Sequence, residues 1–131
     1  MSRGRQDEPG APPALNEVAL RGRLSAPAEE RTLPSGDVIV TLRVVVPREG
    51  PVARRPTGVT EVRRAPVDTI DVVCWTARTR RATLRLDAGD FVEVGGALRR
   101  RFYGGPAGRQ SRYEVEAASV RRVAKGAPVA S

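Results

Sequence analysis

The chain of 131 residues contains no histidine and one cysteine, and aromatic residues make up only 4% of it. An internal disulfide and the usual zinc clusters are therefore excluded. No catalytic pair or activated nucleophile stands out among the acidic residues, so we expect neither enzymatic activity nor a cofactor. No apolar run approaches the about 18 residues of a membrane span, and the N-terminal segment lacks the apolar stretch of a signal peptide. These absences predict a cytoplasmic protein without a membrane partner or a small-molecule substrate.

Positive charge is abundant by contrast. The chain has 23 basic and 15 acidic residues, a formal net charge of +8, and Lys125 is its only lysine. Arginine in place of lysine carries little information, because a GC-rich coding sequence produces the same bias. The excess of positive charge does not follow from that bias. It favours a polyanionic partner, with nucleic acid as the first candidate.

Five segments show the period-two alternation of apolar and polar residues that is typical of strands. One helix is predicted over residues 76–86, between the third and fourth strands, because Gly89 suits the left-handed turn after a helix. This order predicts an all-β fold, a five-stranded OB-fold Greek-key barrel with one short helix. The predicted strands cover residues 15–24, 37–46, 67–75, 90–103 and 112–123.

The remaining segments read as tails and connections. Residues 1–15 are polar and rich in proline and are predicted to be a flexible tail, as is the short segment 124–131. Residues 16–123 then form one domain. Residues 26–37 are predicted to be a connection that ends in a Ser-Gly-Asp turn. Residues 47–66 form a long basic connection, and such a loop indicates either a function or solvated disorder.

The run LRRRFYGG, residues 98–105, closes the fourth predicted strand. Continuing the period of two places Leu98 on the face of the valine core and Arg99, Arg101 and Tyr103 on the opposite face. Phe102 faces the other way and is predicted to plug the barrel end. Rings stack on bases and guanidinium groups neutralise phosphates, so the second face is a candidate nucleic-acid surface.

The sequence resembles the bacterial single-stranded DNA-binding proteins from Asn16 to Val123. The stretches that carry the resemblance are NEVALRGRL, LPSGDVIVTLRV, DTIDVVCWTARTRRATLRLDAGDFVEVGGALRRRFY and GRQSRYEVEAASVRRV, in this order. The resemblance implies an OB-fold barrel that assembles as a homotetramer, a dimer of dimers, around which single strands wrap without sequence preference.

The resemblance also implies particular binding residues. An aromatic on the third strand corresponds to Trp75, one at the end of the fourth strand to Tyr103, and the basic residues beside it to Arg99 and Arg101. Trp75 shares the parity of Asp71, which favours the exposed face, although a core tryptophan remains the alternative. Further candidates for phosphate contacts are arginines of the second strand and the long connection: Arg43, Arg54, Arg55, Arg63 and Arg64.

Two departures from the family pattern modify this expectation. Thr69 and the region of Pro47 stand where the family has further aromatics, which predicts a lower affinity per nucleotide. The C-terminal sequence KGAPVAS is neither glycine-rich nor acidic, so the chain looks like a shortened member. The predicted function is sequence-nonspecific binding and protection of single-stranded DNA in replication, recombination or repair. The alternative is an OB-fold protein of RNA binding or primosome-type assembly.

Overall fold

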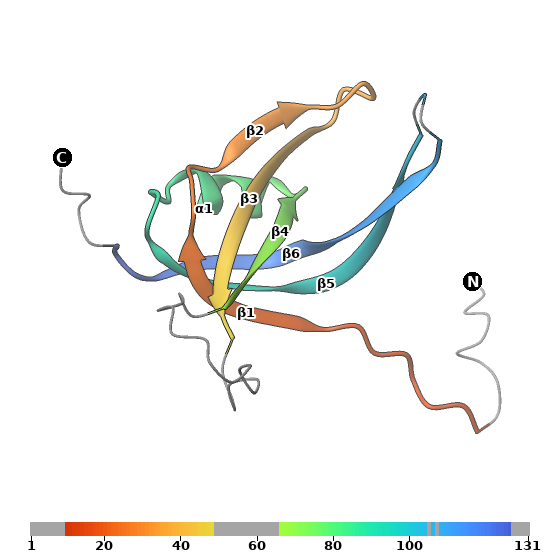
Figure 1. Cartoon of the computed structure of the whole chain (residues 1–131), viewed down its shortest axis with the longest axis horizontal. Coiled ribbons are helices and arrows are strands. Elements are labelled where there is room, and N and C mark those ends of the chain that lie inside the picture. Colours follow the sequence, from red (N-terminus) through yellow and green to blue (C-terminus); the bar gives the residue numbers. More distant parts are fainter. Residues whose placement is uncertain (1–9, 49–65, 105, 107, 127–131) are drawn as a thin grey trace, which may run out of the picture.

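The described part of the chain forms six strands and one short helix (Figure 1). The computed structural model describes residues 10–48, 66–104, 106 and 108–126, with Tyr103 described by its backbone alone. No helix in these ranges is long and apolar enough to cross a membrane. The elements are β1 (Val18–Leu24), β2 (Glu29–Thr32), β3 (Val38–Pro47), β4 (Val67–Cys74), α1 (Ala77–Leu84), β5 (Phe91–Tyr103) and β6 (Gln110–Ala124).

The five predicted strands close into a ring. Strand β1 pairs with β5 along one edge and with β3 at Arg23 and Leu24, while β6 joins β5 to β4, the latter in parallel. The ring order is therefore β1, β5, β6, β4, β3 and back to β1. At Gly22 a Cβ atom would collide with the carbonyl oxygen of Val45. Glycine at this position lets β1 cross closely over β3, and the predicted barrel is confirmed.

The sixth strand corrects the prediction for residues 26–37. They are not merely a connection, because β2 lies among them and pairs antiparallel with β3 from Glu29 opposite Thr41 to Thr32 opposite Val38. All four residues of β2 are exposed. The segment EERT therefore has no apolar alternation by which a strand could be recognised. Backbone pairing across the turn that follows β2 makes this strand.

The helix is shorter than predicted, over residues 77–84. It begins after Thr76, whose Oγ1 accepts a hydrogen bond from the backbone N of Thr79 at 3.1 Å, as is usual for an N-cap. Gly89 has a φ of +91°, the left-handed conformation expected of it after the helix. The helix packs against β3, β4 and β6, and so covers one part of the barrel.

The barrel interior is aliphatic, as the low aromatic content requires. Val40, Val44 and Val92 are fully buried, and the core as a whole draws on β1, β3, β4, β5 and β6. Cys74 is a packed strand residue of this core, and burial raises the pKa of its thiol. Burying this apolar surface is the main force that holds the ring together.

Asp90, just before β5, forms hydrogen bonds that connect it to the chain after β6. Its carboxylate accepts hydrogen bonds from the backbone N of Asp87 at 2.8 Å, from the backbone N of Gly126 at 3.0 Å and from Arg122 Nε at 2.9 Å. Its side chain is only 3% exposed. The two backbone donors, followed by Arg122, lower the pKa of Asp90 to about 2. The ionised carboxylate is therefore part of the folded structure.

Beyond the ring, β5 and β6 continue as a two-stranded ribbon, which we call the arm (residues 98–103 and 110–114). Strand β1 pairs with β5 no further than Gly96, and β4 reaches β6 at Val115 and Glu116. Figure 1 shows the arm and the β2–β3 hairpin projecting from the barrel. Two predictions fail here, because Leu98 is 44% exposed and Phe102 is 53% exposed. Both have the parity of core residues, but the arm extends beyond the barrel core.

Candidate nucleic-acid interface

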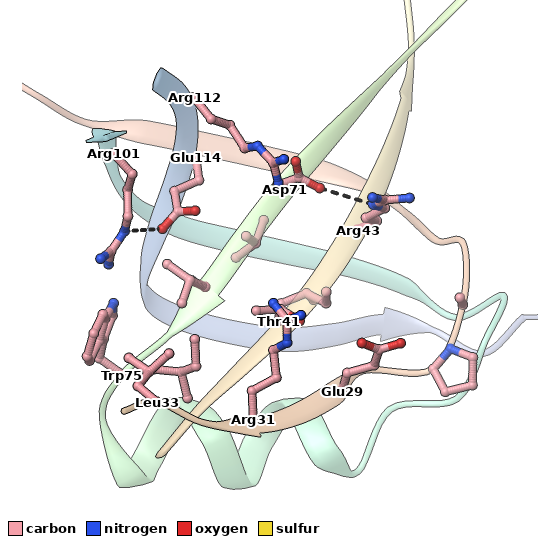
Figure 2. Close-up of a pocket in the computed structure, with 16 residues that line it drawn as sticks. Glu29, Arg31, Leu33, Thr41, Arg43, Asp71, Trp75, Arg101, Arg112 and Glu114 are labelled. Carbon is pink, nitrogen blue, oxygen red and sulfur yellow. Dashed lines mark hydrogen bonds and ion pairs between the residues drawn. The ribbon is translucent and has the colours of Figure 1, made fainter. Parts of the chain in front are cut away.

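A groove with a volume of about 470 Å³ lies between the β2–β3 hairpin and the arm. Its floor is formed by residues of β3 and β4, and its walls by residues of β2 on one side and of β5 and β6 on the other (Figure 2). The polar and aromatic side chains that line it are Glu29, Arg31, Thr41, Arg43, Asp71, Trp75, Arg101, Arg112 and Glu114.

Trp75 and Arg101 lie together at one end of the groove. Trp75 follows the last residue of β4 and is partly buried, and the guanidinium carbon of Arg101 lies 4.9 Å from the centroid of its ring. The indole Nε1 is buried and has no hydrogen-bond partner among the described residues. Trp75 is therefore a groove residue rather than a core tryptophan, and its ring is held beside a cation.

Carboxylates hold two of the groove arginines. Arg101 Nε donates to Glu114 Oε2 at 2.6 Å, and Arg43 Nε donates to Asp71 Oδ1 at 3.1 Å (Figure 2). Each of these guanidinium groups carries further N–H donors on its terminal nitrogens. Four arginines and three carboxylates line the groove. Its positive charge is therefore largely balanced while no ligand is bound.

The predicted residues fall into three groups. Trp75, Arg43 and Arg101 line the groove. Arg99 lies on the same face of β5 but outside the groove lining, and its Nε donates to Glu116 Oε1 at 3.1 Å. The backbone of Tyr103 pairs with Gln110 at the far end of β5. The side chain of Tyr103 lies outside the described part of the chain, as do the predicted arginines of the long connection, Arg54, Arg55, Arg63 and Arg64.

The structure adds groove residues that the pattern did not single out. Arg112 lies directly opposite Arg101 in the β5–β6 register, and Arg31 comes from β2, which was not predicted to be a strand. The carboxylates were missed as well, although Asp71 and Glu114 alternate with apolar residues in the sequence. Only the pairing register between strands tells which arginine each carboxylate faces.

The closed ring with its helix between β4 and β5, and a groove that combines a ring with arginines, define an OB-fold barrel of the kind that binds single-stranded nucleic acid. Residues 15–123 match the model of the single-strand binding protein family, and the chain belongs to this family. Single-stranded DNA binding is the activity that this membership assigns to it.

A solved structure supports the fold independently. The chain is similar to the protein in a Plasmodium falciparum SSB complex with ssDNA, with a TM-score of 0.65 and 15% sequence identity. The match covers 86% of this chain and 98% of the other. A comparison with curated proteins gives no match. At this identity the likeness concerns the fold, and the roles of individual residues are argued from the groove itself.

Proposed function

We propose that the protein binds single-stranded DNA in the groove, with a base stacked on Trp75 and phosphates held by Arg43, Arg101 and, beside the groove, Arg99. The observation that carries this proposal is the guanidinium of Arg101 at 4.9 Å from the indole centroid in a groove open to solvent. Every base has a π-face and every nucleotide a phosphate, so this recognition is independent of sequence.

DNA phosphates bind to groove arginines that already pair with carboxylates. The side chain of Arg43 is 65% exposed and that of Asp71 is 37% exposed, and ion pairs this open to water contribute little to stability. A DNA phosphate therefore replaces Asp71 at Arg43 at low cost. At the partly buried pair of Arg101 and Glu114, the terminal nitrogens of Arg101 accommodate a phosphate while Nε stays with Glu114.

We extend the interface to residues whose side chains lie outside the described part of the chain. Tyr103 has the parity of Arg101 on β5 and provides a second stacking ring. The arginines of the long connection, Arg54, Arg55, Arg63 and Arg64, provide further phosphate contacts. Residues 16–123 constitute the binding domain in this proposal.

The biological role we propose is protection of single-stranded DNA in replication, recombination or repair, without catalysis. We further propose a homotetramer. Its support is the open edge of β1, which pairs with β5 from Val18 to Arg23 but with β3 only at Arg23 and Leu24. An open strand edge is a template for pairing with a second chain. Light scattering tests this assembly, and a 14.1 kDa monomer at micromolar concentration contradicts it.

The test of the binding function uses Trp75, the only tryptophan of the chain, as a fluorescent reporter. Single-stranded DNA, duplex DNA and RNA of equal length are titrated separately. We expect quenching by single-stranded DNA and little response to the duplex. Trp75→Phe, followed with labelled DNA, is the control because it retains a stacking ring. Stronger quenching by RNA favours the RNA-binding alternative, and no quenching by any single strand overturns the proposal.

A further inference from the structure

The arm has a second exposed face, on the side opposite the groove, which we call the back face. It consists of Leu98, Arg100 and Phe102 from β5, with Ser111 and Tyr113 from β6. Arg100 lies directly opposite Tyr113, and Phe102 lies opposite Ser111, in the β5–β6 register. Alternate residues of a strand point to opposite faces, so these side chains point away from Arg101 and Glu114.

The rings of the back face do not serve a core in the described part of the chain. Phe102 is 53% exposed and Tyr113 is 58% exposed. Both lie beyond the last residues at which β1 pairs with β5 and β4 pairs with β6. In a chain with only 4% aromatic residues, two rings on one open ribbon need an explanation other than packing inside the barrel.

Arginines hold these rings in place. The guanidinium carbon of Arg100 lies 5.0 Å from the centroid of Phe102 and 5.6 Å from that of Tyr113. Arg109 approaches Phe102 from the turn at 4.6 Å. Arg100 donates to Ser111 Oγ at 3.3 Å, and neither Arg100 nor Arg109 has a carboxylate partner among the described residues. The positive charge of the back face is therefore uncompensated, unlike that of the groove.

We propose that the back face is a second binding surface for the same single strand, which passes from the groove around the arm. The proposal rests on the proposed function. Rings at the surface offer stacking platforms, and Arg100 and Arg109 offer donors to phosphates without a competing carboxylate. A second copy that docks through its own back face is the less suitable occupant, because it would bring Arg100 and Arg109 of the two copies together.

The test compares strands of two lengths on matched variants. A double variant, Phe102→Leu with Tyr113→Leu, keeps apolar bulk on the arm and removes both π-faces. Phe91→Leu is the control, because Phe91 is an exposed ring of the same strand at its far end from the arm. Oligothymidylates of about 4 and about 16 nucleotides bracket the site sizes of OB folds.

We expect the double variant to bind the longer strand about fivefold more weakly or worse and the shorter strand normally, with Phe91→Leu unchanged for both. Arg100→Gln with Arg109→Gln lowers the salt slope for the longer strand, by about 0.7 for each phosphate that is no longer neutralised. Thermal melting of each variant verifies folding. Quenching of Trp75 at saturation stays the same, since the groove is untouched.

Three results overturn the proposal. The proposal is wrong if both double variants bind the longer strand with unchanged affinity. It is also wrong if their affinities for the short and the long strand fall equally. A change in molecular mass on substitution makes the back face an interface between copies instead. If the unsubstituted protein fails to bind either strand, the proposed function itself is wrong, which is a result distinct from weaker binding at the back face alone.

Discussion

The two faces of the arm differ although their arginines are neighbours in the sequence. Arg99 and Arg101 pair with Glu116 and Glu114 across the strand, whereas Arg100 between them lies over two rings and has no acidic partner among the described residues. The three consecutive arginines thus belong to two separate surfaces, because successive strand residues point in opposite directions. On the groove face, an incoming phosphate meets arginines that already pair with carboxylates. Binding on the back face neutralises charge that no carboxylate balances.

The largest effect is expected from Trp75→Ala. Trp75 is the only ring that lines the groove within the described part of the chain, and its removal weakens single-strand binding by about 1–3 kcal/mol. Trp75→Phe keeps a platform and retains most of the affinity. Fluorescence anisotropy with labelled DNA measures both, after thermal melting has verified folding. Equal affinities for Trp75→Ala and the unsubstituted protein would place the strand outside the groove.

Tyr103→Ala tests the groove-side parity of β5 at the end of the arm. If Tyr103 stacks on a base, the variant loses about 1–3 kcal/mol, and most of this loss persists at high salt because stacking is not a charge effect. Arg101→Ala should instead weaken binding mainly at low salt and flatten the salt slope by about 0.7. Titrations over a range of salt concentrations separate the two. Normal binding combined with early melting would make Tyr103 a packing residue.

The ion pair of Asp90 with Arg122 contrasts with the exposed pair of Arg43 and Asp71 in the groove. The pKa of Asp90 is about 2, below its ordinary value of 3.8, so the ionised form stabilises the fold. This contribution is complete above about pH 4 and is lost as the pH falls towards 2. We expect Asp90→Asn to melt earlier at pH 7, and the gap from the unsubstituted protein to close in acid. Identical melting of both at pH 7 would contradict this role.

The smallest effect is expected from Glu114→Gln, and its sign matters most. The substitution removes the negative charge beside Arg101, which weakens the attraction of its terminal nitrogens for a phosphate, so DNA affinity should rise about two- to fivefold. Glu116→Gln frees Arg99 outside the groove lining and serves as the matched control, with a smaller gain. Isothermal titration at low salt resolves the difference. A loss of affinity in Glu114→Gln would show that the carboxylate positions Arg101 rather than weakening its attraction for a phosphate.

The strands of the ring and the main residues of its core follow from the local pattern of the sequence. Val40, Val44 and Val92 have the predicted core parity of their strands and are fully buried, because a period of two puts one side of each strand into the barrel. The same alternation placed Arg99 and Arg101 on one face. Charge and residue type were enough to indicate a polyanionic partner, and the family resemblance with the parity of Asp71 predicted Trp75 as a binding residue, which stays a prediction although Trp75 lines the groove.

What covers each face of a strand depends on contacts between segments that lie far apart in the sequence. Leu98 and Phe102 have the parity of core residues, yet they are exposed because β1 and β4 end before they reach the arm. Strand β2 exists only through its pairing with β3, since its own residues have no apolar pattern. The carboxylate opposite each arginine likewise depends on the register between strands. Alternation is a local property of the chain, whereas burial and ion pairing depend on partners that lie far away in the sequence.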